Sequence, residues 1–109
     1  ASNATTFDIL LSMGDESVER YRLALRAWAT EDLDLATELA TSDGAMTVVR
    51  ERLVAELVRL EGPSAVEIAL ATDTAGRALE RIADHARIIG ARLRYLITGD
   101  PHHLAAEVR

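Results

Sequence analysis

Residues 64–99 read SAVEIALATDTAGRALERIADHARIIGARLRYLITG, and this stretch decides the fold. Its apolar and small residues recur at alternating steps of four and three, which is typical of the buried edge of a helix in a bundle. The pattern holds for about 35 residues, or roughly 50 Å of α-helix. We therefore predict one long amphipathic helix over 64–98. Its predicted core seam consists of Ile68, Thr72, Ala75, Leu79, Ile82, Ala86, Ile89, Leu93 and Leu96.

Local signals mark both ends of this helix. Gly62-Pro63 interrupts any preceding helix, and Ser64 with Glu67 three residues later reads as a capping box. Gly99 is suited to end the helix in a left-handed conformation. Asp100-Pro101 then resembles a cap followed by the first position of a helix. We expect residues 100–109 to be a tail or the start of a further helix.

Two further amphipathic patterns precede the long helix. The first predicts a helix over about 6–29, with Phe7, Leu11, Gly14, Val18, Tyr21, Leu25 and Trp28 in its seam. The second predicts a helix over about 32–61, with Leu35, Leu39, Met46, Val49, Leu53, Leu57 and Leu60 in its seam and Gly44 as a weak point. Because the connections are short, neighbouring helices must run antiparallel. The expected fold is all-α, an antiparallel up-down-up three-helix bundle.

Composition limits the classes of protein to consider. A chain of 109 residues, 49% of them hydrophobic, suits one domain with one core. We assign residues 5–99 to it and interpret residues 1–4 as a tag remnant. The net charge is −6 and no basic run exists, which argues against nucleic-acid binding by this segment. No apolar stretch approaches the roughly 20 residues of a membrane-spanning helix. Cysteine is absent, which excludes thiolate metal sites.

A charged stripe follows the face of the third helix opposite its seam. It comprises Asp73, Arg77, Glu80, Asp84 and Arg87. Glu80 and Asp84 lie one turn apart, so their carboxylates could jointly hold a cation such as iron, zinc, magnesium or calcium. The competing interpretation is that arginines pair with these acids as ordinary solvated neighbours.

The run Leu79-Glu80-Arg81-Ile82-Ala83-Asp84-His85-Ala86 identifies a family. It resembles the third-helix signature of the PhoU phosphate-uptake regulators, in which glycine stands at the position of Ala83, and seven of its eight residues match. The arrangement of the two earlier helices and of the Pro63 turn is similar as well. The chain therefore resembles one PhoU three-helix repeat.

The resemblance implies a metal site with a second half on the second helix. In the family, paired carboxylate motifs on helices two and three can bind iron or other metal clusters. Glu80 and Asp84 match the helix-three motif, and Asp43 matches the first position of its partner. The second position is Thr47, which lacks a carboxylate. Glu80, Asp84 and Asp43 are thus the predicted ligands of divalent or iron ions, and no other cofactor is expected.

The resemblance also implies a function. PhoU proteins carry two such repeats and act in the cytoplasm as accessory regulators of the phosphate ABC transporter and its sensor kinase. We expect a non-enzymatic adaptor that reaches the membrane only through a partner, and a homodimer in which a second copy covers the flank of the missing repeat. The alternatives are a regulatory domain of a larger ion-transport or transcription-regulator chain, and a metal-binding bundle.

Overall fold

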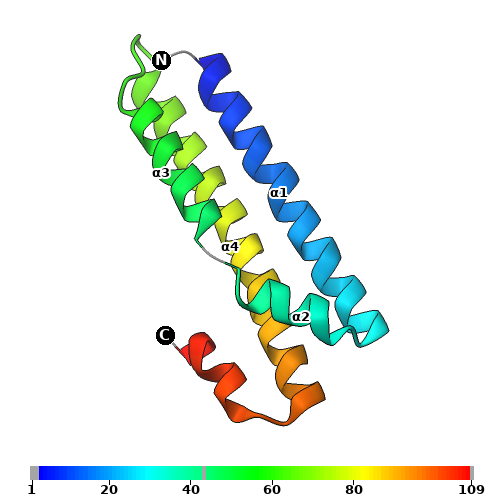
Figure 1. Cartoon of the computed structure of the whole chain (residues 1–109). Coiled ribbons are helices and arrows are strands. Elements are labelled where there is room, and N and C mark those ends of the chain that lie inside the picture. The colour runs from blue at the N-terminus through cyan, green and yellow to red at the C-terminus, as the bar shows by residue number, and fades with distance from the viewer. Residues whose placement is uncertain (1–2, 43, 109) are drawn as a thin grey trace.

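The computed structural model describes residues 3–42 and 44–108, and all regular elements in these residues are helical. They are α1 (Asn3–Thr30), α2 (Leu33–Ala40), α3 (Ala45–Leu57), α4 (Ala65–Thr98) and the 3₁₀-helix η1 (Pro101–Val108). In Figure 1, α1 and α4 are the two long rods, α2 and α3 follow one another along α4, and η1 turns back at the end of α4. The prediction of an all-α protein is confirmed.

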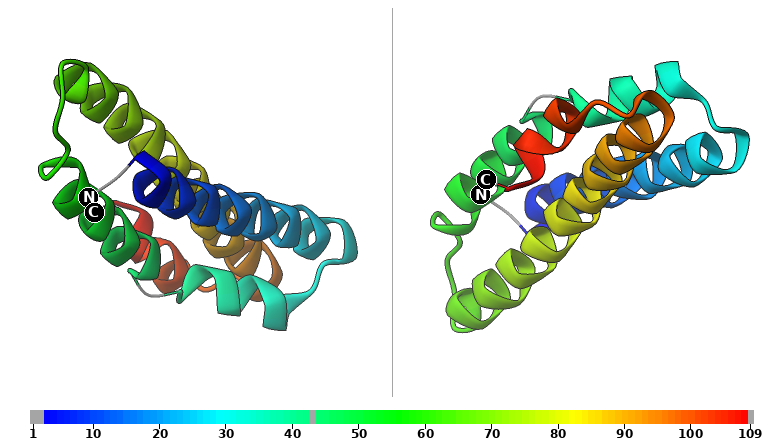
Figure 2. Two further views of the ribbon diagram at one scale, coloured as in Figure 1. Left: turned by 90° about the horizontal axis from the view of Figure 1, so that it is seen from above. Right: turned by 90° about the horizontal axis from the view of Figure 1, so that it is seen from below.

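The second predicted helix is in fact two helices. The predicted continuous helix over 32–61 is wrong, because the chain leaves the α-helical conformation after Ala40 and resumes it at Ala45. Gly44 is the N-cap residue of α3, so the glycine that weakens a helix interior lies at the break. Figure 2 shows that the break lets α2 take a different direction from α3.

Caps at three helix ends differ in how well the sequence predicts them. Asp32 caps α2, with its Oδ1 accepting from the amide of Leu35 at 3.0 Å. At the end of α4, Gly99 has φ +72° and donates its amide to the Tyr95 carbonyl oxygen at 2.7 Å, as predicted. Ser64 precedes α4 but makes no side-chain cap hydrogen bond, so the predicted capping box is wrong.

The core consists of two clusters along α4. One joins α1, α3 and α4 and contains Ile9, Met13, Met46, Leu53, Leu57 and Ala83. The other joins α1, α2 and α4 and contains Ala24, Ala27, Ala36, Leu39, Ala86 and Leu93. Every member of the seam predicted for 32–61 is buried or partly buried, so that seam is confirmed.

Small residues bring α1 and α4 close together. Ser17, Ala24 and Ala27 on α1 are completely buried. The hydroxyl of Ser17 lies 2.8 Å from the carbonyl oxygen of Leu79 on α4. A side chain as short as serine can reach a backbone group on another helix only where the two backbones are close.

The predicted core seam of the first helix faces outward. Its six large side chains are 37–64% exposed, and we call them the α1 stripe: Phe7, Leu11, Val18, Tyr21, Leu25 and Trp28. Ile82 and Leu96 on α4 are also exposed, in contrast to the prediction. The prediction that these residues lie in the core is wrong. α1 packs closely on α4 through the smaller residues of an adjacent face, and this packing leaves the large side chains exposed.

Candidate functional site

A polar groove runs between α3 and α4 and contains all five residues of the charged stripe. It is open to solvent, has a volume of about 1180 Å³ and receives residues from both helices, from α1 and from the loop before α3. Five arginines and three carboxylates line it: Arg20, Arg50, Arg77, Arg81, Arg87, Asp73, Glu80 and Asp84. The lining therefore has a surplus of two positive charges in a chain of net charge −6.

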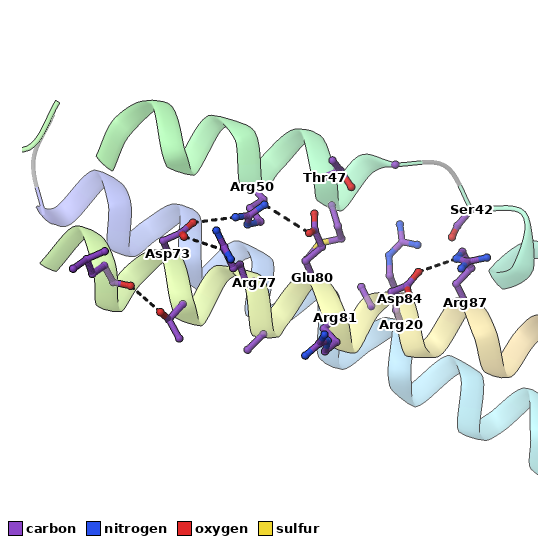
Figure 3. A pocket seen from close by; sticks show the side chains of 16 residues that line it. Arg20, Ser42, Thr47, Arg50, Asp73, Arg77, Glu80, Arg81, Asp84 and Arg87 are labelled. Carbon is purple, nitrogen blue, oxygen red and sulfur yellow. Dashed lines mark hydrogen bonds and ion pairs between the residues drawn. The ribbon is translucent and has the colours of Figure 1, made fainter. Parts of the chain in front are cut away.

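Arg50 on α3 connects the two helices across this groove. One terminal nitrogen, Nη2, lies 3.2 Å from Oδ1 of Asp73, and the other, Nη1, lies 3.9 Å from Oε1 of Glu80 (Figure 3). The three side chains are only 22%, 27% and 29% exposed, so solvent screens these ion pairs less than it screens surface pairs. The sequence-based prediction did not include Arg50. Arg50 follows Thr47 by three residues, so both lie on the same face of the helix. This is the face that was expected to meet the third helix.

Two further arginines of the groove, Arg77 and Arg87, pair with acids along α4. Arg77 Nε lies 3.1 Å from Oδ2 of Asp73, and Arg87 Nε lies 3.0 Å from Oδ1 of Asp84. The charged stripe is therefore not simply solvent-facing, because the side chains of Asp73, Glu80 and Arg87 are roughly three-quarters buried. Arg77 and Arg87 thus pair with acids of the stripe as the competing interpretation expects, but Asp73 and Arg87 are not ordinary solvated side chains.

Two polar atoms in the groove have unused hydrogen-bonding capacity. Within the described residues, Arg50 Nε and Glu80 Oε2 are both buried and have no hydrogen-bond partner. One of them is a donor and the other an acceptor. The unsatisfied groups of the groove thus complement each other chemically.

The predicted metal ligands are only partly placed together. Glu80 and Asp84 line the groove, whereas Asp43 lies outside the described residues. Within residues 3–42 and 44–108, no three His, Cys, Asp or Glu side chains are grouped so as to hold a metal ion. Glu80 and Asp84 each face an arginine. The described donors therefore do not fit a metal site, and metal binding stays a prediction.

A small polar cluster lies at the start of η1. Asp100 Oδ1 accepts from the His102 amide at 3.0 Å and lies 2.9 Å from His102 Nδ1. The hydrogen bond from the His102 amide, followed by that from its ring, lowers the pKa of the Asp100 carboxyl. Asp100 thus caps η1, as the Asp100-Pro101 pattern predicts.

Within the described residues, no helix combines the length and hydropathy that crossing a membrane requires. The fold and the groove define a class: an all-helical domain with a charge-lined groove on one side and an exposed apolar stripe along α1. The PhoU domain family matches residues 10–93, and the chain belongs to this family. The resemblance read from residues 79–86 is confirmed.

Curated relatives carry a common description. The chain is 37% identical over 95 residues to a "Phosphate-specific transport system accessory protein PhoU homolog" of Pseudomonas putida, covering 84% of this chain and 37% of that protein. Homologues with the same description from Pseudomonas aeruginosa and Deinococcus radiodurans are 36% and 33% identical, and the match covers 39% and 42% of their lengths. The chain thus spans about two-fifths of these relatives. We found no solved structure that matches it.

Proposed function

We propose that this chain is a non-enzymatic cytoplasmic adaptor that regulates phosphate uptake and phosphate-starvation signalling. The observation that carries the proposal is the PhoU domain match over residues 10–93. The printed names of the relatives, accessory proteins of the phosphate-specific transport system, support the same role. The partners proposed from the resemblance are the phosphate ABC transporter and its sensor kinase.

A binding experiment tests this role. The chain would be immobilised and exposed to the detergent-solubilised phosphate transporter and to the sensor kinase from the same organism, with an unrelated ABC transporter as the control. We expect binding to at least one of the two phosphate-system proteins and none to the control. Equal binding to all three, or to none, would contradict the proposal.

We further propose that two copies associate through the α1 stripe. Six large apolar side chains in one line on a single helix form the kind of exposed surface that marks an interface. A two-fold axis would place the same stripe of each copy against the other. The relatives are more than twice as long, so they have additional chain that could cover the corresponding face.

Sedimentation velocity with paired variants tests the dimer. The double variant Val18→Ser plus Leu25→Ser removes two exposed side chains from the stripe, and Val58→Ser is the matched control. Val58 is 78% exposed but belongs to the end of α3. We expect the wild type and Val58→Ser to dimerise and the double variant to be monomeric. A wild-type chain that is strictly monomeric at high concentration would refute self-association.

The second candidate function is a regulatory domain of a larger ion-transport or transcription-regulator chain. The coverage of only about two-fifths of the relatives favours it, because another segment would then cover the α1 stripe. The full-length reading frame of the source gene separates the two candidates. A fused transport or DNA-binding domain would support this second role, and a neighbouring phosphate transporter gene would support the adaptor.

A further inference from the structure

We propose that Arg50 is the resident cation of the α3–α4 groove, and that with Arg87 it neutralises the carboxylates expected to bind metal, so that the groove needs no metal ion. This inference disagrees with the metal site that the resemblance implies. It is independent of the proposed adaptor role, because it concerns only how α3 is held against α4.

The spacing of the two carboxylates that Arg50 contacts suits an arginine better than an ion. Asp73 and Glu80 are seven residues apart on α4, which is roughly 10 Å along the helix axis. A metal ion needs oxygen ligands at about 2.0–2.6 Å, so one ion does not readily bridge two such side chains. Arg50 reaches each carboxylate with a different terminal nitrogen, at 3.2 Å and 3.9 Å. The planar fork of the guanidinium provides the extra reach.

The charge balance of the groove also opposes a further cation. Asp73 already faces two arginines, Arg50 and Arg77, and Asp84 is paired with Arg87 at 3.0 Å. A divalent ion beside Glu80 would lie close to the guanidinium of Arg50. Two positive charges a few ångströms apart in a partly buried groove repel one another strongly. The ion would therefore have to displace Arg50 from a position in which its side chain is only 22% exposed.

The two unsatisfied atoms support the same conclusion. A vacant cation site would present acceptors only. Among the described residues that line the groove, the buried side-chain atoms without a partner are one donor, Arg50 Nε, and one acceptor, Glu80 Oε2.

A double-mutant cycle tests the coupling between Arg50 and Glu80. Arg50→Met and Glu80→Gln are made singly and together, and unfolding by urea is followed by circular dichroism. We expect each single change to raise the unfolding equilibrium constant by roughly tenfold. The double variant should fall short of the product of the two by about threefold or more.

The matched control is the cycle of Arg50→Met with Asp84→Asn. Asp84 lines the same groove on the same helix but pairs with Arg87. We expect the effects in this cycle to multiply independently. Independent effects in the Glu80 cycle, or equal coupling in both cycles, would overturn the proposal.

Metal binding is measured directly on the same proteins. Chelator-treated wild type, Glu80→Gln and Asp84→Asn are titrated with Mn²⁺ and Zn²⁺ by calorimetry, and their thermal midpoints are recorded with and without metal. We expect no heat of binding from the groove and no shift in midpoint. Binding that persists unchanged in both variants lies elsewhere and agrees with the proposal. Wild-type binding that either variant abolishes would overturn it.

Discussion

A Cβ atom at Gly90 on α4 would lie 2.8 Å from the carbonyl oxygen of Ala36 on α2, so the backbones of these helices meet without room for a methyl group. The same Cβ would lie 2.8 Å from Cβ of Leu39. Neither neighbour is the far end of a flexible side chain. Gly90→Ala must therefore separate α2 from α4, and we expect a loss of about 2–3 kcal/mol of unfolding free energy by chemical denaturation.

Gly14→Ala is the control for this prediction. Gly14 is also inside a helix, but a Cβ there would lie 3.9 Å from the nearest atom, Cδ1 of Leu79, which is ordinary contact. Alanine in a helix interior is favoured over glycine by about 0.5–1 kcal/mol. The two substitutions should thus have opposite signs. Equal destabilisation by both would contradict the close approach at Gly90.

The caps of α2 and α4 predict a second contrast. The carboxylate of Asp32 accepts from the Leu35 amide, so Asp32→Ala should cost about 1 kcal/mol of unfolding free energy. Ser64 makes no side-chain cap hydrogen bond, so Ser64→Ala should change stability by no more than a few tenths of a kcal/mol. Thermal unfolding of both variants measures the difference. A larger effect at Ser64 than at Asp32 would contradict these assignments.

Trp28 reports on the proposed dimer interface. It is the single tryptophan of the chain, is 48% exposed and lies in the α1 stripe. If two copies associate through the stripe, the indole ring leaves water on association. Its fluorescence emission should therefore shift to longer wavelength on dilution through the dissociation constant. Emission that stays constant while sedimentation shows dissociation would place the interface on another face.

The Asp100 carboxyl makes the stability of the start of η1 depend on pH. Its pKa is lowered in the folded state by the His102 amide and ring, with smaller contributions from the charges of His102 and His103 and an opposing effect of burial. A carboxyl with a lowered folded-state pKa stabilises the fold above its ordinary pKa, about 3.9, and loses that contribution as the pH falls through the lower value.

The measurement for this prediction is an NMR titration of the Asp100 carboxyl carbon together with the amide of His102. We expect a midpoint below the ordinary pKa and loss of the His102 hydrogen bond in the same pH range. Asp100→Asn should remove this acid dependence of the His102 amide. An ordinary midpoint for Asp100 would contradict the cap at η1.

Much of the fold follows from local rules. The four-three periodicity over residues 64–98, the left-handed Gly99 and the Asp100-Pro101 start are properties of neighbouring residues, and each is present in the structure. The run from Leu79 to Ala86 likewise suffices to recognise the family. The sequence indicated the break at Gly44 only as a weak point inside one predicted helix. Whether a glycine interrupts a helix depends also on what the flanking segments can pack against, because its free-energy cost alone is small.

The burial of α1 and the chemistry of the groove depended on tertiary structure. Two faces of the first helix carry apolar or small residues at helical spacing. Hydropathy favoured the face with Leu25 and Trp28 as the buried one. Packing selected the other, because Ser17, Ala24 and Ala27 let α1 approach α4 closely. Periodicity along one helix cannot choose between two such faces, since the choice depends on the shape of the partner helix.

The ion pairs of Glu80 were decided in the same way. The sequence by itself determined that Glu80 and Asp84 lie one turn apart on an α-helix, an arrangement that is compatible both with a share in a metal site and with arginine pairs on that face. Only the packing of α3 on α4 decided which cation Glu80 meets, because Arg50 lies thirty residues earlier in the chain and reaches the carboxylate across the groove. A contact between distant segments is set by how the helices pack, and no local pattern records it.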